Sequence, residues 1–199
     1  VERFDITDRR ITPVTSAVLQ KPRAFHNASL ITIPGAVPVQ NLVISGGDDG
    51  VAPVREVEVL RATPVVELIT PSSDTLDSTA ATHAAAVVLP AADCRVVVPG
   101  RAVDTTAPCV LITGGCLAVV RNGACSMTQS TSVVLDYSAL PGSRRLTGPA
   151  LFRPRWGHHA FHLPDPNGAS MVMLAGGIFQ SSGDALPISA EILRRAGTG

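Results

Sequence analysis

Apolar residues of the chain gather in short runs that alternate with turn-forming residues. The segments 41–47 (NLVISGG), 110–115 (VLITGG) and 170–177 (SMVMLAGG) are rich in Val, Leu and Ile and end at glycine. Branched aliphatic residues favour strands, and Gly and Pro punctuate them. None of the runs approaches the roughly 20 apolar residues that a membrane-spanning helix needs. The pattern therefore predicts an all-β protein of short strands.

The same order of motifs recurs three times. Each copy has a histidine-led apolar strand, a turn, a second apolar strand that ends in Gly-Gly, a loop and a third strand, and the first two copies add a fourth edge strand. The opening histidines are His26, His83 and His158, and the glycine pairs are Gly46-Gly47, Gly114-Gly115 and Gly176-Gly177. The third strands of two copies and the start of the chain align the glutamates Glu2, Glu58 and Glu191. Such internal repetition indicates stacked structural units.

The repeat divides the chain into four segments. Residues 1–22 are interpreted as the end of a preceding unit, 23–79 and 80–152 as two full units, and 153–199 as an incomplete unit. A unit of four short strands cannot bury both its faces alone and is stabilised by stacking on its neighbours. Because the first and last segments both contain a third strand, they do not complete one another. We therefore expect part of a larger closed ring.

These motifs resemble the kelch-repeat β-propeller family, in which a Gly-Gly pair ends the second strand of each blade. The resemblance spans nearly the whole chain and rests on the order and recurrence of the motifs. Kelch blades usually carry a Tyr on the third strand and a Trp on the fourth; Asp136-Tyr137 matches the first feature, and no Trp stands at the second. The pattern looks like the divergent bacterial type related to the propeller of galactose oxidase. It implies a kelch-type β-propeller of about three to four four-stranded antiparallel blades, in an incomplete ring.

Four cysteines, Cys94, Cys109, Cys116 and Cys125, are confined to a span of 32 residues, and none belongs to a close C-x-x-C pair of the kind typical of zinc sites. An even, clustered set indicates two disulfides and an oxidising compartment, so the protein is expected to be secreted, periplasmic or at the cell surface. Three pairings are possible, of which the nearest-neighbour pairing is the simplest. The alternative is four reduced thiols that only pack.

The recurring histidines are expected to be structural, because a catalytic residue is needed once and not in every unit. In the cluster His158, His159 and His162, successive strand residues point to opposite faces, and His162 lies about 13 Å from His158 at the rise of a strand. We therefore expect no metal site. In the middle unit Ala80 is taken to replace the arginine that stands three residues before the histidine in the other two units.

Two further polar features have competing interpretations. Arg23 and Arg155 are expected to pair with Glu58 and Glu191 as ion pairs between blades; the alternative is arginines that line a central channel for an acidic ligand. The segment 48–50 (Asp-Asp-Gly) is expected to form a solvated turn, with a calcium ligand set as the alternative.

The composition narrows the possible functions. With 16 basic and 16 acidic residues the net charge is zero, which argues against nucleic acid as a partner. No nucleophile elbow or phosphate-binding loop is present, and no catalytic residue or cofactor is expected. We expect a non-catalytic scaffold, completed by the remaining blades of the same protein, that presents the insertions 90–109 and 116–130 to a protein or carbohydrate partner. The alternative is part of a galactose oxidase-like enzyme whose catalytic residues lie outside this chain, because that copper site needs two tyrosines and only Tyr137 is present.

Overall fold

The computed structural model describes residues 2–5, 7, 9–13, 18–61, 67–69, 74–76, 81–98, 106–118, 124–164, 170–181, 184–187 and 190–194. Over these residues the regular structure is antiparallel strand, with no α-helix and one short 3-10 helix at Asp93–Val96. Within the same ranges, no helix is long and apolar enough to span a bilayer. The chain is all-β, as its apolar pattern predicts.

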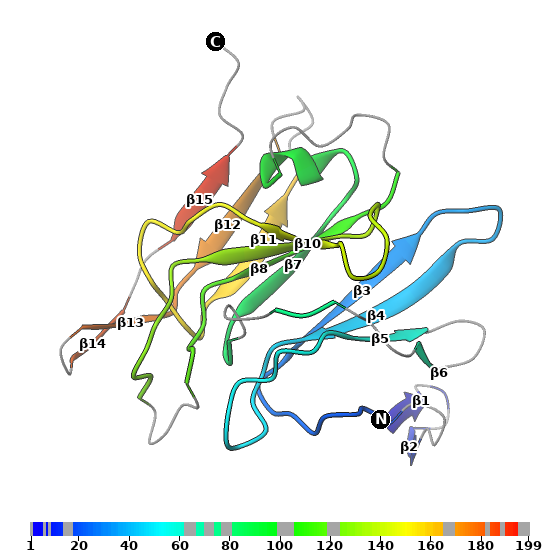
Figure 1. Cartoon of the computed structure of the whole chain (residues 1–199), viewed down its shortest axis with the longest axis horizontal. Helices are drawn as coiled ribbons and strands as arrows, with labels where there is room; N and C mark the ends of the chain where they lie inside the picture. Colours follow the sequence, from blue (N-terminus) through cyan, green and yellow to red (C-terminus); the bar gives the residue numbers. More distant parts are fainter. Residues whose placement is uncertain are drawn as a thin grey trace, which may run out of the picture.

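Three antiparallel sheets make up most of the structure, and each runs up and down in chain order (Figure 1). The first sheet contains β3 (Asn27–Ile33), β4 (Val39–Ser45), β5 (Glu58–Arg61) and β6 (Glu67–Ile69). The second contains β7 (Ala85–Leu89), β8 (Cys109–Thr113), β9 (Ser132–Asp136) and β10 (Arg145–Thr147). The third contains β11 (His159–Leu163), β12 (Met171–Ala175) and β15 (Glu191–Arg194). None of these three sheets closes on itself.

Two hairpins accompany the sheets. The strands β1 (Glu2–Asp5) and β2 (Arg10–Pro13) pair with one another at the start of the chain. The strands β13 (Ile178–Ser181) and β14 (Asp184–Pro187) form a hairpin within the connection between β12 and β15. This second hairpin lies where the sequence predicts only a loop.

Strand register makes the three sheets comparable residue by residue. Ile44 pairs with Glu58, Ile112 with Val133, and Leu174 with Glu191. The first strands of the sheets are also neighbours, because β7 packs against β3 on one side and against β11 on the other (Figure 1). The sheets therefore stack in chain order, and the second sheet lies between the other two.

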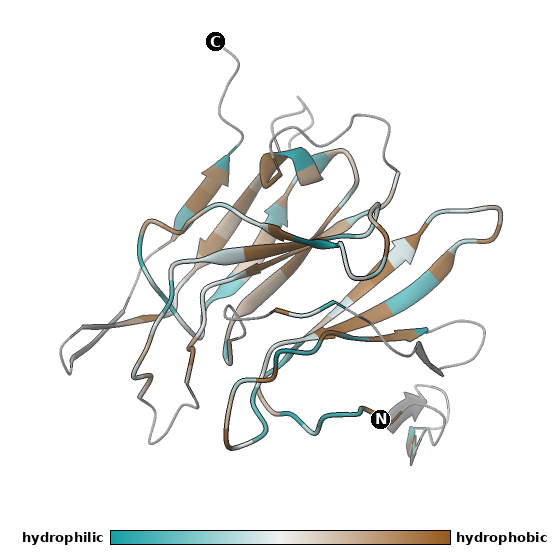
Figure 2. Cartoon of the chain, in the orientation of Figure 1, coloured by the Kyte–Doolittle hydropathy of each residue, from teal (hydrophilic) through white to brown (hydrophobic). Residues whose placement is uncertain are grey.

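Apolar cores fill the two spaces between successive sheets. Val110 and Ile112 of β8 pack with Val43 of the first sheet, while Leu111 packs with Val172 of the third. Successive residues of a strand point to opposite faces, so a strand that is covered on both faces needs a continuous apolar run. Figure 2 shows this run as apolar colour along the strands of the second sheet. The residues Val110, Leu111 and Ile112 are apolar without interruption because both faces of β8 are interior.

The Gly-Gly pairs connect each sheet to the next. All six glycines have positive φ, between +56° and +102°. The Gly47 N–H donates to the Ala81 carbonyl at 3.1 Å, and the Gly115 N–H donates to the Arg155 carbonyl at 2.7 Å. A Cβ on Gly114 would lie 2.5 Å from that same Arg155 oxygen, whereas no described atom lies within 4 Å of the corresponding position on Gly176. Gly46 and Gly114 are thus needed both for their φ and for the approach of the following sheet, whereas Gly176 is needed for its φ alone.

Variants at Gly114 and Gly176 test two requirements separately, the positive φ and the close approach of the following sheet. In Gly176→Ala we expect a loss of about 1–2 kcal/mol, since only the left-handed backbone is strained. In Gly114→Ala the Arg155 carbonyl must also move away, so the loss should exceed that of Gly176→Ala by roughly 2 kcal/mol or more. Urea denaturation of the two variants measures the difference. Equal losses would contradict a close contact between the second and third sheets.

Candidate functional site

A buried ion pair lies at the edge of the first sheet where β4 ends at Gly46-Gly47; we call this side of the three sheets the Gly-Gly edge. Arg23 pairs with Glu58, and its guanidinium also donates to the Gly46 carbonyl at 3.2 Å. The Gln20 N–H donates to the same carboxylate at 2.7 Å. Each charge is therefore offset by an opposite charge and by backbone dipoles, which a buried ion pair requires.

The third sheet repeats this cluster. Arg155 donates to Glu191 at 2.9 Å and to the Gly176 carbonyl at 3.2 Å. The Phe152 N–H, three residues before the arginine as in the first sheet, donates to the carboxylate at 2.6 Å. Both predicted pairs form, but each lies within one sheet and not between blades. The reason is that the arginine leads into the first strand and the glutamate begins the third strand of the same sheet, at the same edge.

In the second sheet the equivalent carbonyl, that of Gly114, accepts a hydrogen bond from an uncharged side chain. Ala81 and Val133 occupy the arginine and glutamate positions. The Gln129 side chain instead donates to the Gly114 carbonyl at 2.7 Å, and Thr131 donates to its amide oxygen at 2.6 Å. A neutral amide thus takes over the hydrogen bond that arginine makes in the other sheets. The remaining repeat glutamate, Glu2, begins β1, and its side chain lies outside the described part.

The predicted register of the histidines needs a correction. In each sheet, the residue directly after the Gly-Gly pair forms an isolated bridge with a residue that precedes the first strand. The bridges join Asp48 to Ala24, Cys116 to Thr82 and Ile178 to Trp156. His83 is therefore equivalent to Phe25 and Gly157, and all three have positive φ of 54°, 54° and 64°. Ala84 stands at the position of His26 and His158, and Ala81, not Ala80, replaces the arginine. The run of alanines at 84–86 carries no polar residue that could fix the register from sequence.

His158 lies between the second and third sheets. It is 4% exposed, and its Nε2 lies 2.8 Å from the Thr113 hydroxyl of the preceding sheet. Burial lowers the pKa of His158 to about 4, with further lowering by the charges of Arg155 and His159. His26 is exposed, and the Ser45 hydroxyl, equivalent to Thr113, is buried with no hydrogen-bond partner among the described residues. The second sheet has Ala84 at the position of His158 and so offers no imidazole there.

The other histidines of the third sheet do not converge. His159 is exposed, while His162 lies 2.8 Å from the Asp93 carboxylate of the 3-10 helix. The described residues include no group of three or more His, Cys, Asp or Glu that could hold a metal ion. A pocket of about 210 Å³ opens between β3, β7 and β11, beside Asn27, His158 and Phe161. Its volume is below the roughly 300 Å³ of a typical ligand site.

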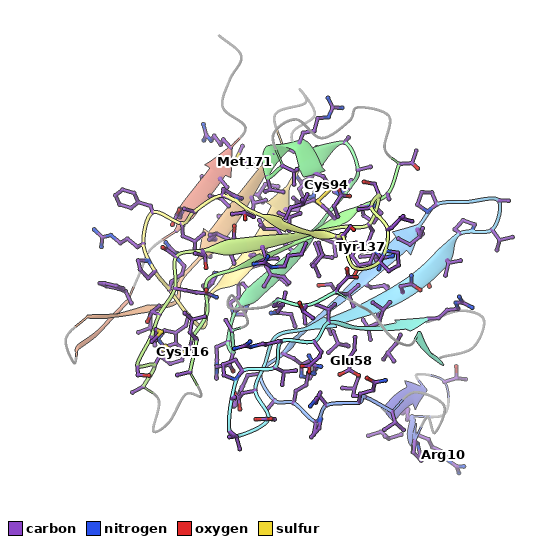
Figure 3. All side chains as sticks on the ribbon, in the orientation of Figure 1. Arg10, Glu58, Cys94, Cys116, Tyr137 and Met171 are labelled. Carbon is purple, nitrogen blue, oxygen red and sulfur yellow. A yellow bond between two sulfur atoms is a disulfide. The ribbon has the colours of Figure 1, made fainter. Side chains whose placement is uncertain are left out.

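Two disulfides form, Cys94–Cys109 and Cys116–Cys125, and no cysteine is free. This is the simplest of the three possible pairings, and the alternative of reduced thiols is wrong. Cys109 begins β8, whereas Cys116 follows its end, so the two bonds lie at opposite ends of the second sheet (Figure 3). The described parts of the two insertions, 90–98 with 106–109 and 116–118 with 124–130, therefore lie at opposite ends of the second sheet. The residues 116–118 and 124–130 belong to the Gly-Gly edge.

A chain of polar contacts joins the first and second sheets at the Gly-Gly edge. Thr82, which is fully buried, donates to the Asp48 carboxylate at 2.7 Å, and its hydroxyl lies 3.0 Å from His83 Nδ1. Phe25 stacks on the His83 ring at 4.1 Å between centroids. Burial lowers the pKa of His83, and the Asp48 charge partly opposes this shift.

Residues 48–50 form a turn, as predicted, but only Asp49 and Gly50 are exposed to solvent, because Asp48 is buried. The Asp49 carboxylate accepts the N–H groups of Val51 and Ala52, each at 2.9 Å, and the Asp48 carboxylate accepts the Gly50 N–H at 3.1 Å. These backbone hydrogen bonds lower the pKa of Asp49. Both carboxylates thus brace the loop in which Val51 is exposed.

Sequence patterns missed several of these residues. The contacts among Asp48, Thr82 and His83 join two units, and none of these residue types recurs at the same place in the third. Gln129 replaces an arginine from a different position of the chain, so alignment of the repeats cannot find it. Comparison with known proteins adds no assignment: no protein-family model matches the chain, and no curated protein matches it.

Removal of either partner should expose the cost of an unpaired buried charge. We expect Arg155→Ala and Glu191→Ala each to lower the free energy of unfolding by about 3 kcal/mol, and the double variant to lose much less than the sum. The exposed Arg153→Ala should change it by no more than about 0.5 kcal/mol. Chemical denaturation tests all four variants, and additive losses would contradict the pairing.

His158 should make stability depend on pH. Because its folded pKa of about 4 lies below the unfolded value of 6.5, the unfolded chain binds more protons between these limits. The contribution of the neutral His158 to the free energy of unfolding is complete above pH 6.5 and is lost as the pH falls toward 4. The total loss is on the order of 3 kcal/mol. Urea denaturation across this window should give a shallower pH dependence for His158→Gln than for the native chain. Parallel curves would contradict a buried neutral imidazole.

Proposed function

We propose that the chain is a run of kelch-type β-propeller units that acts as a non-catalytic binding scaffold, with its partner bound at the Gly-Gly edge. The unit assignment is supported by the equivalent bonds from Gly47 to Ala81 and from Gly115 to Arg155, which relate each sheet to the next in the same way. It is also supported by the adjacency of β3, β7 and β11, since in a propeller the first strands line a common axis.

The outer face of the third sheet supports a further unit of the same protein beyond it. Ile192 is 44% exposed and Met173 is half-buried, whereas the equivalent Val134 and Leu111 of the second sheet are fully buried by the sheet that follows. No described atom lies within 4 Å of a Cβ built on Gly176, the first glycine of the last pair. We therefore expect another blade to cover this face.

Location outside the reducing cytoplasm is supported by the two disulfides. Such bonds persist in oxidising compartments and are rare where glutathione keeps thiols reduced. A secreted, periplasmic or cell-surface scaffold accords with them.

The observation that carries the binding proposal is the character of the loops at the Gly-Gly edge. They expose large apolar side chains, Phe25 at 59%, Val51 at 82% and Met127 at 58%. The loop that carries Val51 is held in place by the Asp48 and Asp49 turn, and the loop that carries Met127 by the Cys116–Cys125 bond. Apolar groups on rigid loops bind a partner with little ordering cost.

We expect the native chain to bind a ligand on an array of oligosaccharides or of extracellular proteins, and Val51→Ser with Met127→Ser to weaken that binding about tenfold or more. Leu140→Ser is the matched control, because Leu140 is 79% exposed in the loop after β9, at the opposite edge. Surface plasmon resonance compares the three. Equal affinities for all three proteins, or no binding on either array, would contradict the proposal.

A further inference from the structure

Phe25 and His83 occupy a backbone conformation in which glycine is the ordinary residue. Both have φ of 54°, and the equivalent position in the third sheet is Gly157. A side chain in the left-handed region costs roughly 1–2 kcal/mol, and such strain is concentrated at functional sites. The backbones already perform the structural task, since the His83 N–H donates to the Phe25 carbonyl and the Gly157 N–H to the His83 carbonyl. The two side chains are not needed for those bonds.

The hydrogen bonds around Thr82 fix the proton on the His83 ring. A carboxylate can only accept, so the single hydroxyl hydrogen of Thr82 is donated to Asp48. The Thr82 oxygen must then accept a hydrogen bond from His83 Nδ1. In a neutral ring this leaves Nε2 without a proton, as a hydrogen-bond acceptor. The buried Asp48 and Thr82 thus hold His83 in one tautomer.

The His83 ring is flanked by aromatic side chains. Phe25 stacks on it with an interplanar angle of 21°, and Trp156 meets it edge-on at 5.5 Å. Since Phe25 remains 59% exposed, much of its ring is open to a ligand. The junction of the first two sheets therefore places an exposed aromatic ring directly beside an oriented, uncharged acceptor. Asp49 adds an exposed carboxylate to the same loop as Asp48.

We propose that this junction is a carbohydrate-binding site, in which a sugar ring packs on Phe25 and one of its hydroxyl groups donates to His83 Nε2. The assignment rests on the proposed binding function and names its ligand class. A sugar presents a C–H face that packs on an aromatic ring and hydroxyl donors that need acceptors of fixed direction. A protein partner would need no single oriented acceptor beside the ring, so the observations favour carbohydrate.

The test separates binding from folding, because Gly157 shows what the fold itself requires. Phe25→Gly removes the ring and relieves the strained φ, and His83→Asn removes Nε2 with a residue that tolerates this conformation. We expect both variants to melt no lower than about 2 °C below the native chain. We also expect each to weaken binding of array-selected oligosaccharides about tenfold or more. Leu140→Ser should bind them normally.

A second readout needs no ligand. Nitrogen NMR shifts of the imidazole should show His83 as the Nδ1–H tautomer in the native chain and a shift toward Nε2–H in Thr82→Val. An Nε2–H tautomer in the native chain would overturn the assignment. So would oligosaccharide binding that survives Phe25→Gly and His83→Asn, or binding of proteins alone, although both of these outcomes leave the scaffold proposal standing. Absence of binding to either ligand class would overturn both.

Discussion

The contact between a Gly-Gly turn and the backbone of the following sheet is the constraint on which the rest of the structure depends. Gly47 and Gly115 donate to the Ala81 and Arg155 carbonyls, and any side chain on the first glycine of either pair would separate the sheets. This approach sets the spacing at which the apolar faces meet and brings β3, β7 and β11 together. It also places Phe25 beside His83, so the proposed binding junction is a consequence of the same packing.

Around that contact, buried polar groups form clusters of hydrogen bonds and ion pairs. In the first and third sheets a glycine carbonyl, an arginine, a glutamate and a backbone N–H form one cluster. The second sheet changes the arginine and the glutamate together, to Ala81 and Val133, and recovers the lost hydrogen bond through Gln129. A single replacement would have left a buried charge without a partner, which explains why the two changes occur as a pair.

The strands and their order could be predicted from sequence, because apolar runs that end at Gly-Gly are local features. Contacts between residues that are far apart in the sequence could be predicted only in part. The Arg155 and Glu191 pair was predicted from its recurrence, but its location within one sheet depends on which strand ends share an edge. The register of His83 was not predictable, since the alanines beside it give no polar pattern, and the β13–β14 hairpin is too short to stand out from a loop. The Asp48, Thr82 and His83 chain belongs to one junction only, so no repeat reveals it.

The position of the disulfides has a mechanical consequence. The second sheet packs against both of the others, so a force applied between the first and third sheets is transmitted through it. One covalent bond closes each end of this sheet, at Cys94–Cys109 and at Cys116–Cys125. When the chain is pulled, each bond limits how far the loop that it closes can extend, so these two loops lengthen less than loops of the same length without a crosslink would.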